Sequence, residues 1–263
     1  MNFPKIMGIV NVTPDSFSDG GKYFNTNDAV KHAFELIEDG AEYIDVGGES
    51  TRPGSDSVDD EEELKRVLPV IKNILKEKPD TIISIDTTKP YVALRAVGEG
   101  AKIINNIAGT KNDENLVKIA SENHVGLILM HIQGEPRNMQ SNPVYNDVVK
   151  DIFGELERSV NYAKSKGVKN IFADVGIGFG KTLEHNIALL KNIEKFKELN
   201  VPVMLGISRK SFIGKLLNIE STDERDLPTV LIHALLLTKP IDMIRVHNVK
   251  NINMLKQLYE KIF

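Results

Sequence analysis

Two residues near the end of the chain, Arg245 and His247, carry side chains suited to holding phosphate. They lie two positions apart in a β-branched run, and side chains two apart on a strand point the same way. A guanidinium fork beside an imidazole is a good receptor for a phosphate or pyrophosphate group. The alternative is that Arg245 pairs with a neighbouring carboxylate in the core, because unpaired charges are rarely buried.

A second cationic segment, residues 205–215, leaves a predicted strand and opens a predicted helix. Arg209 and Lys210 stand there beside Ser208 and Ser211, where a helix N-terminus favours an anion. Lys210 could form a Schiff base, but its hydroxyl-rich surroundings give no reason for a lowered pKa. We therefore expect it to act by hydrogen bonding, and a solvated basic turn is the alternative for this segment alone.

The segment at residues 174–182 resembles a phosphate-binding P-loop in composition, but the spacing of its glycines excludes that motif. The pattern GxxxxGK[ST] requires glycine where this chain has Val175, and Gly176 is one residue too close. The glycines instead allow a tight turn beside a flat ligand, with Phe179 over the ligand and Asp174 beneath it. A plain strand-to-helix turn fits the segment equally well when it is taken alone.

Polar residues also end other predicted strands, and they include Asp86 and Asn105. Together with Asp174, these carboxylate and amide groups can recognise the donor and acceptor edge of a heterocycle with steep selectivity. Singly, each is more often a cap or a satisfied interior group, and the same holds for Asp45 and His131.

No histidine pair has the spacing of a transition-metal site. A Mg²⁺ ion held mostly by substrate phosphates needs only one protein oxygen, and Asn11 is the candidate ligand. Any metal at the site is therefore expected to be a hard cation.

Eight short β-branched runs must position these side chains, and a segment of helix length separates each from the next. The runs occupy residues 6–12, 43–46, 81–86, 102–107, 125–131, 170–175, 201–207 and 243–247. Because they do not alternate polar with apolar residues, we expect strands buried on both faces and therefore parallel. Such a pattern predicts an α/β fold, a (β/α)8 TIM barrel formed as a single domain by residues 1–263. Active sites of these barrels lie at the carboxyl ends of the strands, so the polar strand ends should converge at one mouth.

Two long connections, residues 13–27 and 47–59, follow predicted strands and are rich in Gly, Ser and Asp. Long loops at such positions are usually functional, and we expect them to act as lids. Apolar residues at helical spacing within 64–75 and 183–196 predict helices that pack on the barrel.

Charge and composition narrow the partners of the chain. A formal net charge of -4 provides no field for nucleic acid or an anionic membrane, so we expect small-molecule partners. The absence of cysteine suits a reducing cytoplasm. The N-terminus enters a strand without a charged and apolar leader, and no apolar run approaches about 18 residues, so neither secretion nor membrane spanning is expected.

Six segments in chain order resemble dihydropteroate synthase, namely residues 7–21, 44–55, 85–90, 174–182, 206–214 and 245–247. The resemblance implies a transferase of folate biosynthesis that joins 6-hydroxymethyl-7,8-dihydropterin pyrophosphate to p-aminobenzoate and yields 7,8-dihydropteroate and pyrophosphate. It also implies an SN1-like displacement, a Mg²⁺ cofactor and a homodimer formed through helices near the C-terminal half. A pterin-dependent methyltransferase domain shares the barrel, but it has no pyrophosphate to expel and would not be expected to keep residues 208–210 and 245–247.

The same resemblance assigns roles to individual residues. It implies pterin contacts from Asp86, Asn105, Met130, Asp174, Gly206 and Lys210. It implies pyrophosphate contacts from Asn11, Thr51, Arg245 and His247, with Asn11 also holding Mg²⁺. It implies p-aminobenzoate contacts from Phe17, Arg52, Pro53, Phe179 and Ser211, the first three on the long loops. The catalytic residues among these are Asp86, Lys210, Arg245 and His247.

Three positions depart from the family pattern, with Asn106 in place of Asp, Val175 in place of Pro and Pro228 in place of a small Gly. The first two adjoin predicted pterin ligands, so they motivate an alternative in which the chain is a non-catalytic pterin-binding paralogue. Because every ligand carried over is present, the synthase is the main hypothesis.

Overall fold

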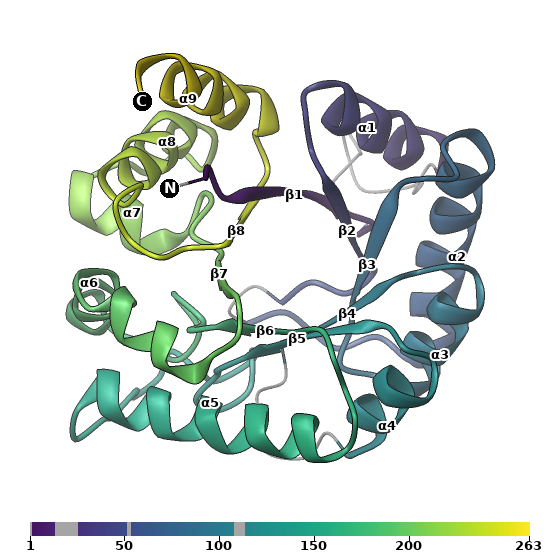
Figure 1. The fold of residues 1–263 in the computed structure, drawn as a ribbon, viewed down its shortest axis with the longest axis horizontal. Helices are drawn as coiled ribbons and strands as arrows, with labels where there is room; N and C mark the ends of the chain where they lie inside the picture. Colours follow the sequence, from purple (N-terminus) through teal and green to yellow (C-terminus); the bar gives the residue numbers. More distant parts are fainter. Residues whose placement is uncertain (1, 14–25, 52–53, 108–113) are drawn as a thin grey trace.

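A computed structural model describes residues 2–13, 26–51, 54–107 and 114–263, so Phe17, Arg52 and Pro53 lie outside the described residues. The chain forms a closed barrel of parallel strands, each paired with its neighbours in sequence order (Figure 1). The strands are β1 (Lys5–Asn11), β2 (Tyr43–Gly47), β3 (Ile82–Asp86), β4 (Ile103–Asn106), β5 (Gly126–Met130), β6 (Ile171–Asp174), β7 (Val203–Leu205) and β8 (Met243–Val246). Each predicted run overlaps one strand, and the predicted TIM barrel is confirmed.

Helices surround the barrel on its outer side (Figure 1). They are α1 (Thr26–Glu38), α2 (Asp60–Glu77), α3 (Pro90–Gly98), α4 (Glu114–Glu122), α5 (Val148–Ser165), α6 (Leu183–Lys191), α7 (Ser211–Leu217), α8 (Asp226–Leu235) and α9 (Val249–Ile262), with 3-10 turns η1 (Ile193–Leu199) and η2 (Asp223–Arg225). The apolar stripe within 64–75 lies in α2, as predicted. The stripe within 183–196 is divided, because the Asn192 side chain donates to the Ala188 carbonyl at 2.8 Å and α6 ends there.

Alternate residues of each strand face the barrel interior, where they form two layers. The lower layer is a separate apolar cluster of Met7, Ile103, Ile128, Met204 and Met243. Because strand side chains repeat every two residues, the next interior positions include Asp45, Asn105 and Arg245. The interior therefore changes from apolar to polar toward the carboxyl ends of the strands. We call this polar end, with the loops that follow it, the barrel mouth.

The larger apolar core lies between the strands and the surrounding helices, and it includes Ile6, Val10, Ile44 and Ile85 from the strands. These side chains are fully buried, and burying one aliphatic side chain stabilises a fold by about 1.5–3 kcal/mol. Burial of both strand faces explains the absence of a polar alternation in the sequence.

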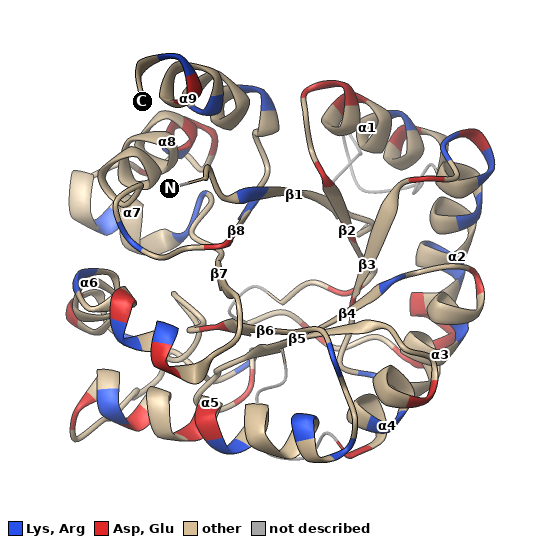
Figure 2. Ribbon diagram, in the orientation of Figure 1, with Lys and Arg blue, Asp and Glu red and all other residues tan. Residues whose placement is uncertain are grey.

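Charged residues lie mainly on the helices, where both signs are interspersed, while the strands are largely uncharged (Figure 2). This distribution agrees with the small net charge of -4. Within the described ranges, no helix combines the length and the apolar character needed to cross a lipid bilayer.

His233 on α8 makes the stability of the fold depend on pH. Its side chain is buried, and its Nε2 atom has no hydrogen-bond partner among the described residues. Burial lowers the pKa of His233 to about 3. The unfolded chain takes up a proton near pH 6.5 and the folded chain does not, so stability is full above that pH and falls as the pH drops toward 3.

We expect His233→Leu to reduce the pH dependence of the unfolding free energy on the acid side by up to about 1.4 kcal/mol per pH unit. Denaturant unfolding of both proteins between roughly pH 4 and pH 7 measures this slope. The exposed His124, which has a positive φ of 56°, provides the control His124→Asn. Parallel curves for the original protein and His233→Leu would contradict the prediction.

Candidate active site

An ion-pair network connects three strands at the barrel mouth. Arg245 on β8 donates from Nε to Asp45 Oδ2 at 2.6 Å and from Nη2 to Asp86 Oδ2 at 2.8 Å. Asn105 on β4 also donates to Asp45 Oδ2, at 2.9 Å. Burial opposes the charge of Arg245, but the carboxylates of Asp45 and Asp86 outweigh it and raise the pKa of the guanidinium. Arg245 therefore pairs with interior carboxylates, as the alternative predicts, while its phosphate-binding role stays a prediction.

The same network leaves acceptor atoms without partners. Asp45 Oδ1, Asp86 Oδ1 and Asn105 Oδ1 are buried and have no hydrogen-bond partner among the described residues. A buried oxygen left unsatisfied costs about 1–3 kcal/mol, so such groups are usually paired in a working state. A ligand that presents N–H donors to this side of the mouth would satisfy them.

Two carboxylates at the mouth have pKa values above their usual range. Burial, opposed by the Arg245 guanidinium and reinforced by Asp45, raises the pKa of Asp86 to about 7. Burial also raises the pKa of Asp174, although Lys210 opposes this shift. Asp174 Oδ1 accepts the main-chain N–H of Gly176 at 2.8 Å, which fixes the carboxylate at the end of β6.

Lys210, at the start of α7, reaches across the mouth to the connection after β6. Its Nζ atom donates to the Ile177 carbonyl and lies 4.4 Å from the centre of the Phe179 ring, a cation–π distance. Burial lowers the pKa of Lys210 to about 8, with Asp174 opposing the shift. The expectation of an unshifted pKa is therefore wrong, because folding packs this side chain under the β6 connection instead of leaving it among hydroxyl groups.

The connection after β6 is a tight turn, as its glycines predict. A Cβ atom at Gly176 would lie 1.9 Å from the His131 carbonyl oxygen, and one at Gly180 would lie 2.3 Å from that of Gln133. Both glycines also have positive φ values, 66° and 62°. Only glycine allows this main chain to approach the β5 connection so closely.

Two further pterin residues of the resemblance line the same end of the barrel. Met130 ends β5 in an apolar cluster with Ile107, Ile132 and Met139, and Phe179 packs against that cluster. Gly206 follows β7, where an added Cβ would lie 3.7 Å from Asp174 Oδ2. Both positions thus adjoin the polar layer.

The expected phosphate-binding residues occupy the strand ends on the β1, β2 and β8 side. Asn11 ends β1 and pairs in register with Gly47, the last residue of β2. Thr51 lies in the connection after β2. His247 follows β8, and its Nδ1 atom lies 3.0 Å from Ser208 Oγ.

A partly buried ion cluster lies at the beginning of the β2 connection. Lys89 Nζ pairs with Glu63 at 2.5 Å and also with Glu49. Arg66 donates to the Gly48 carbonyl at 2.8 Å. Sequence reasoning did not identify this cluster, whose charged residues lie on helix starts and loops far apart in the chain.

Arg209 is not part of the mouth. Its guanidinium forms a bidentate pair with Asp226 on α8, at 2.6 and 2.8 Å, and Asp226 also accepts from Asn248 at 2.9 Å. Arg209 has a positive φ of 59°, which turns its side chain away from that of Lys210. Of the two cations in the predicted anion-binding turn, only Lys210 reaches the mouth, and Ser211 begins α7 beside it.

The described residues include no group of three or more His, Asp or Glu side chains placed to hold a metal ion. Asn11 offers a single amide oxygen at the mouth. This donor set fits a hard cation only if another molecule, such as a pyrophosphate, supplies most of its ligands.

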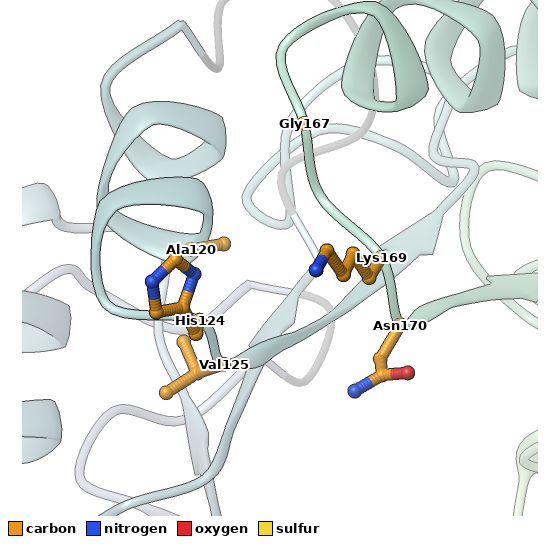
Figure 3. A pocket seen from close by; sticks show the side chains of 6 residues that line it. All are labelled: Ala120, His124, Val125, Gly167, Lys169 and Asn170. Atoms are coloured by element: carbon orange, nitrogen blue, oxygen red, sulfur yellow. The ribbon is translucent and has the colours of Figure 1, made fainter.

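A small cavity of about 70 Å³, whose lining side chains are drawn in Figure 3, lies away from the barrel mouth. Lys169 and Asn170, which immediately precede β6, line it together with Val125, which precedes β5. These are the amino ends of the strands, so the cavity is separate from the polar layer.

Comparison with known proteins agrees with this geometry. The family of pterin binding enzymes matches residues 7–247. A dihydropteroate synthase of Clostridium beijerinckii is 48% identical over 248 residues, which are 93% of this chain and 88% of that protein. The structure of the Xanthomonas albilineans dihydropteroate synthase with 4-aminobenzoic acid has a TM-score of 0.91 and 37% identity, covering 99% of this chain and 93% of that one.

A third relative contains a different bound molecule. The Thermus thermophilus dihydropteroate synthase in complex with 6HMPPP has a TM-score of 0.86 and 32% identity, and the match covers 100% of this chain and 95% of that chain. The similarity therefore extends over nearly the whole of each protein, with the polar barrel mouth included. The chain belongs to the dihydropteroate synthase family of pterin-binding enzymes.

Proposed function

We propose that the barrel mouth condenses 6-hydroxymethyl-7,8-dihydropterin pyrophosphate with p-aminobenzoate and releases 7,8-dihydropteroate and pyrophosphate. The observation that carries this proposal is the row of unsatisfied oxygens of Asp45, Asp86 and Asn105 beside Arg245. A pterin ring presents amino and ring N–H donors, which match these acceptors. The reaction belongs to folate biosynthesis, and the lack of cysteine suits its location in a reducing cytoplasm.

The pterin lies among the polar side chains of the barrel mouth, above the apolar lower layer. Asp86, Asn105 and Asp174 accept its N–H groups, and Lys210 donates to a ring acceptor. Met130 and Gly206 form the sides of the slot. A ligand lacking these donors would leave buried acceptors unpaired, so the site discriminates strongly against it.

The departing pyrophosphate is held by Asn11, Thr51, Arg245 and His247. A guanidinium has five N–H donors, and Arg245 uses one on Asp45 and one on Asp86, so three remain for phosphate oxygens. Asn11 would contribute one ligand to Mg²⁺, with the substrate phosphates supplying the others. When bound, the metal neutralises charge on the leaving group.

The protein residues support an SN1-like displacement. The C–O bond to pyrophosphate breaks first, and the carboxylates of Asp86 and Asp174 stabilise the positive charge that develops on the pterin methylene. The amine of p-aminobenzoate then forms the C–N bond and loses a proton. Because the pterin cation is a strong electrophile, no strong base is needed.

Phe179 and Ser211 hold p-aminobenzoate, with Lys210 between them and the pterin. Phe17, Arg52 and Pro53, which the resemblance assigns to this substrate, remain part of the proposal. In the same proposal, the two long loops close over the mouth and exclude water during the reaction.

The family departures leave this set of contacts in place. Asn106 and Val175 directly follow Asn105 and Asp174, so on a strand they point to the opposite face. Val175 packs in the core between strands and helices. Pro228 lies in the first turn of α8, where proline is tolerated.

The homodimer forms through the C-terminal helices, according to this proposal. Leu227, Leu231 and Leu235 make an exposed stripe on α8, and Met254, Leu258 and Ile262 make one on α9. Helices α8 and α9 pack against each other (Figure 1), and α7 exposes Leu216 and Leu217. Exposed apolar stripes on packed helices favour burial against a second copy in a two-fold arrangement.

The reaction is tested by incubating the pure protein with dihydropterin pyrophosphate, p-aminobenzoate and Mg²⁺ and measuring both products. We expect pyrophosphate and dihydropteroate in equal amounts, with turnover lowered by about 10²-fold or more in Lys210→Ala because one preorganised donor is lost. If the protein releases no more pyrophosphate than Lys210→Ala does, it is a pterin-binding protein without synthase activity.

Pterin affinity should depend on the protonation of Asp86. Its pKa near 7 means that the carboxylate is charged above this pH and protonated below it, where one acceptor site is lost. We expect affinity for a bare pterin to fall toward tenfold per pH unit below pH 7. Calorimetry from roughly pH 5.5 to pH 8 measures this, and Asp86→Asn should bind more weakly with a flatter profile. Equal pH profiles for the two proteins would disprove this role.

The dimer prediction is tested with one charge at the centre of the α8 stripe. Leu231 is 54% exposed, and Leu94 on α3 is 46% exposed, so Leu94→Asp is a matched control for Leu231→Asp. We expect the original protein and Leu94→Asp to be dimeric and Leu231→Asp to be monomeric in analytical ultracentrifugation. A monomeric original protein, or a dimeric Leu231→Asp variant, would refute the proposed interface.

A further inference from the structure

Lys181, which follows the β6 turn, is a buried cation outside the roles assigned above. Its side chain is only 3% exposed. Nζ lies 2.8 Å from the Phe179 carbonyl oxygen, 3.0 Å from His131 Nδ1 and 3.3 Å from the His131 carbonyl oxygen. The amino group thus has three polar atoms within hydrogen-bond distance, two of them carbonyl oxygens that accept its N–H groups.

The three contacts join two neighbouring connections of the barrel mouth. His131 directly follows β5, whereas Phe179 belongs to the turn after β6. The two main chains already approach closely at Gly176 and Gly180. Tyr145 adds a hydrogen bond from its hydroxyl group to the Gly180 carbonyl, at 2.8 Å. Lys181 therefore holds the turn at the residue whose ring contacts Lys210.

His131 gives Lys181 a fixed acceptor. When Lys181 donates to Nδ1, a neutral His131 carries its proton on Nε2, which lies 3.6 Å from Glu155 Oε2. His131 is 2% exposed, and its ring lies 6.0 Å from that of Tyr145. The imidazole thus lies between Glu155 of α5 and Lys181.

Lys181 lies in an electrostatic environment that offers it main-chain partners and, among the described residues, no direct carboxylate partner. Burial lowers its pKa well below the usual value, and the nearby Lys210 lowers it further, while Asp174 and Glu155 oppose the shift. Within the described part of the chain it forms no direct ion pair with a carboxylate, and its direct partners are two carbonyl oxygens and an imidazole nitrogen. Its arrangement is that of a group that holds main chain in place.

We propose that Lys181 is a positioning residue for p-aminobenzoate. Lys181, anchored by His131, fixes the Phe179 main chain and so holds the Phe179 ring against Lys210. This inference rests on the proposed contact between Phe179 and p-aminobenzoate. It concerns the β6 side of the mouth, where Asp174 and Lys210 also lie, whereas Asp86, Asn105 and Arg245 lie on other strands.

The test compares Lys181→Met, which removes the donors and keeps a long side chain, with Lys191→Met at the exposed end of α6. We expect Lys181→Met to raise the KM for p-aminobenzoate by about tenfold or more, since small misplacements of a binding group weaken a site strongly. Calorimetric affinity for a bare pterin should change by less than about threefold, and Lys191→Met should change neither value. A general loss of folded protein would lower the apparent kcat and leave KM unchanged, so KM separates positioning from stability.

Phe179→Ala distinguishes failure of this inference from failure of the proposed contact. If Phe179→Ala leaves the KM for p-aminobenzoate unchanged, the proposed contact itself is wrong. If Phe179→Ala raises KM and Lys181→Met does not, the role of Lys181 is overturned. The double variant should have a KM close to that of Phe179→Ala alone, because the two residues act through one ring. A KM increase equal to the product of the single effects would also overturn the proposal.

His131→Gln provides a second approach if Lys181→Met fails to fold. It removes the imidazole acceptor while Lys181 keeps its two carbonyl partners, so we expect a smaller increase in the same KM. An unchanged KM in a folded His131→Gln variant would exclude His131 as the anchor and overturn the proposal in the form given above.

Discussion

The guanidinium of Arg245 lies between the carboxylates of Asp45 and Asp86 and joins β8 to β2 and β3 across the barrel interior. Two carboxylates so close together in a buried layer repel each other unless a cation lies between them. A buried ion pair seldom adds much net stability, because desolvation offsets the attraction between the charges. Its value here lies in recognition, since it permits a carboxylate-rich surface whose outer oxygens remain available to a ligand.

The rest of the interior is organised around this requirement. The interior face of β4 and β8 carries an apolar residue in its lower half and a polar residue in its upper half, and the two-residue repeat keeps these layers separate. Packing of the lower layer stabilises the closed barrel. The upper layer is therefore left to bind substrate, and the loops and helix starts add Lys210, Phe179 and His247 around it.

The sequence was sufficient to predict the strands, the closed barrel and the polar strand ends, because buried parallel strands have a distinctive pattern and their carboxyl ends must converge. It could not decide between phosphate binding and core pairing for Arg245, since that depends on which residues of other strands lie opposite it. Arg209 and Lys210 are neighbours in sequence, yet a left-handed residue sends them to different places. Burial of Lys181 and Lys210 arises from the fold of the β6 turn, which glycine spacing alone does not specify.

The lower layer has a chemical consequence of its own. Three of its five members are methionines, Met7, Met204 and Met243, and each is at most 1% exposed. Peroxide converts a methionine thioether to a polar sulfoxide, but only where the sulfur can be reached. In a chain without cysteine, no thiol competes for the oxidant. The oxidation rate of these three sulfur atoms therefore reports how often the barrel opens at the amino ends of its strands.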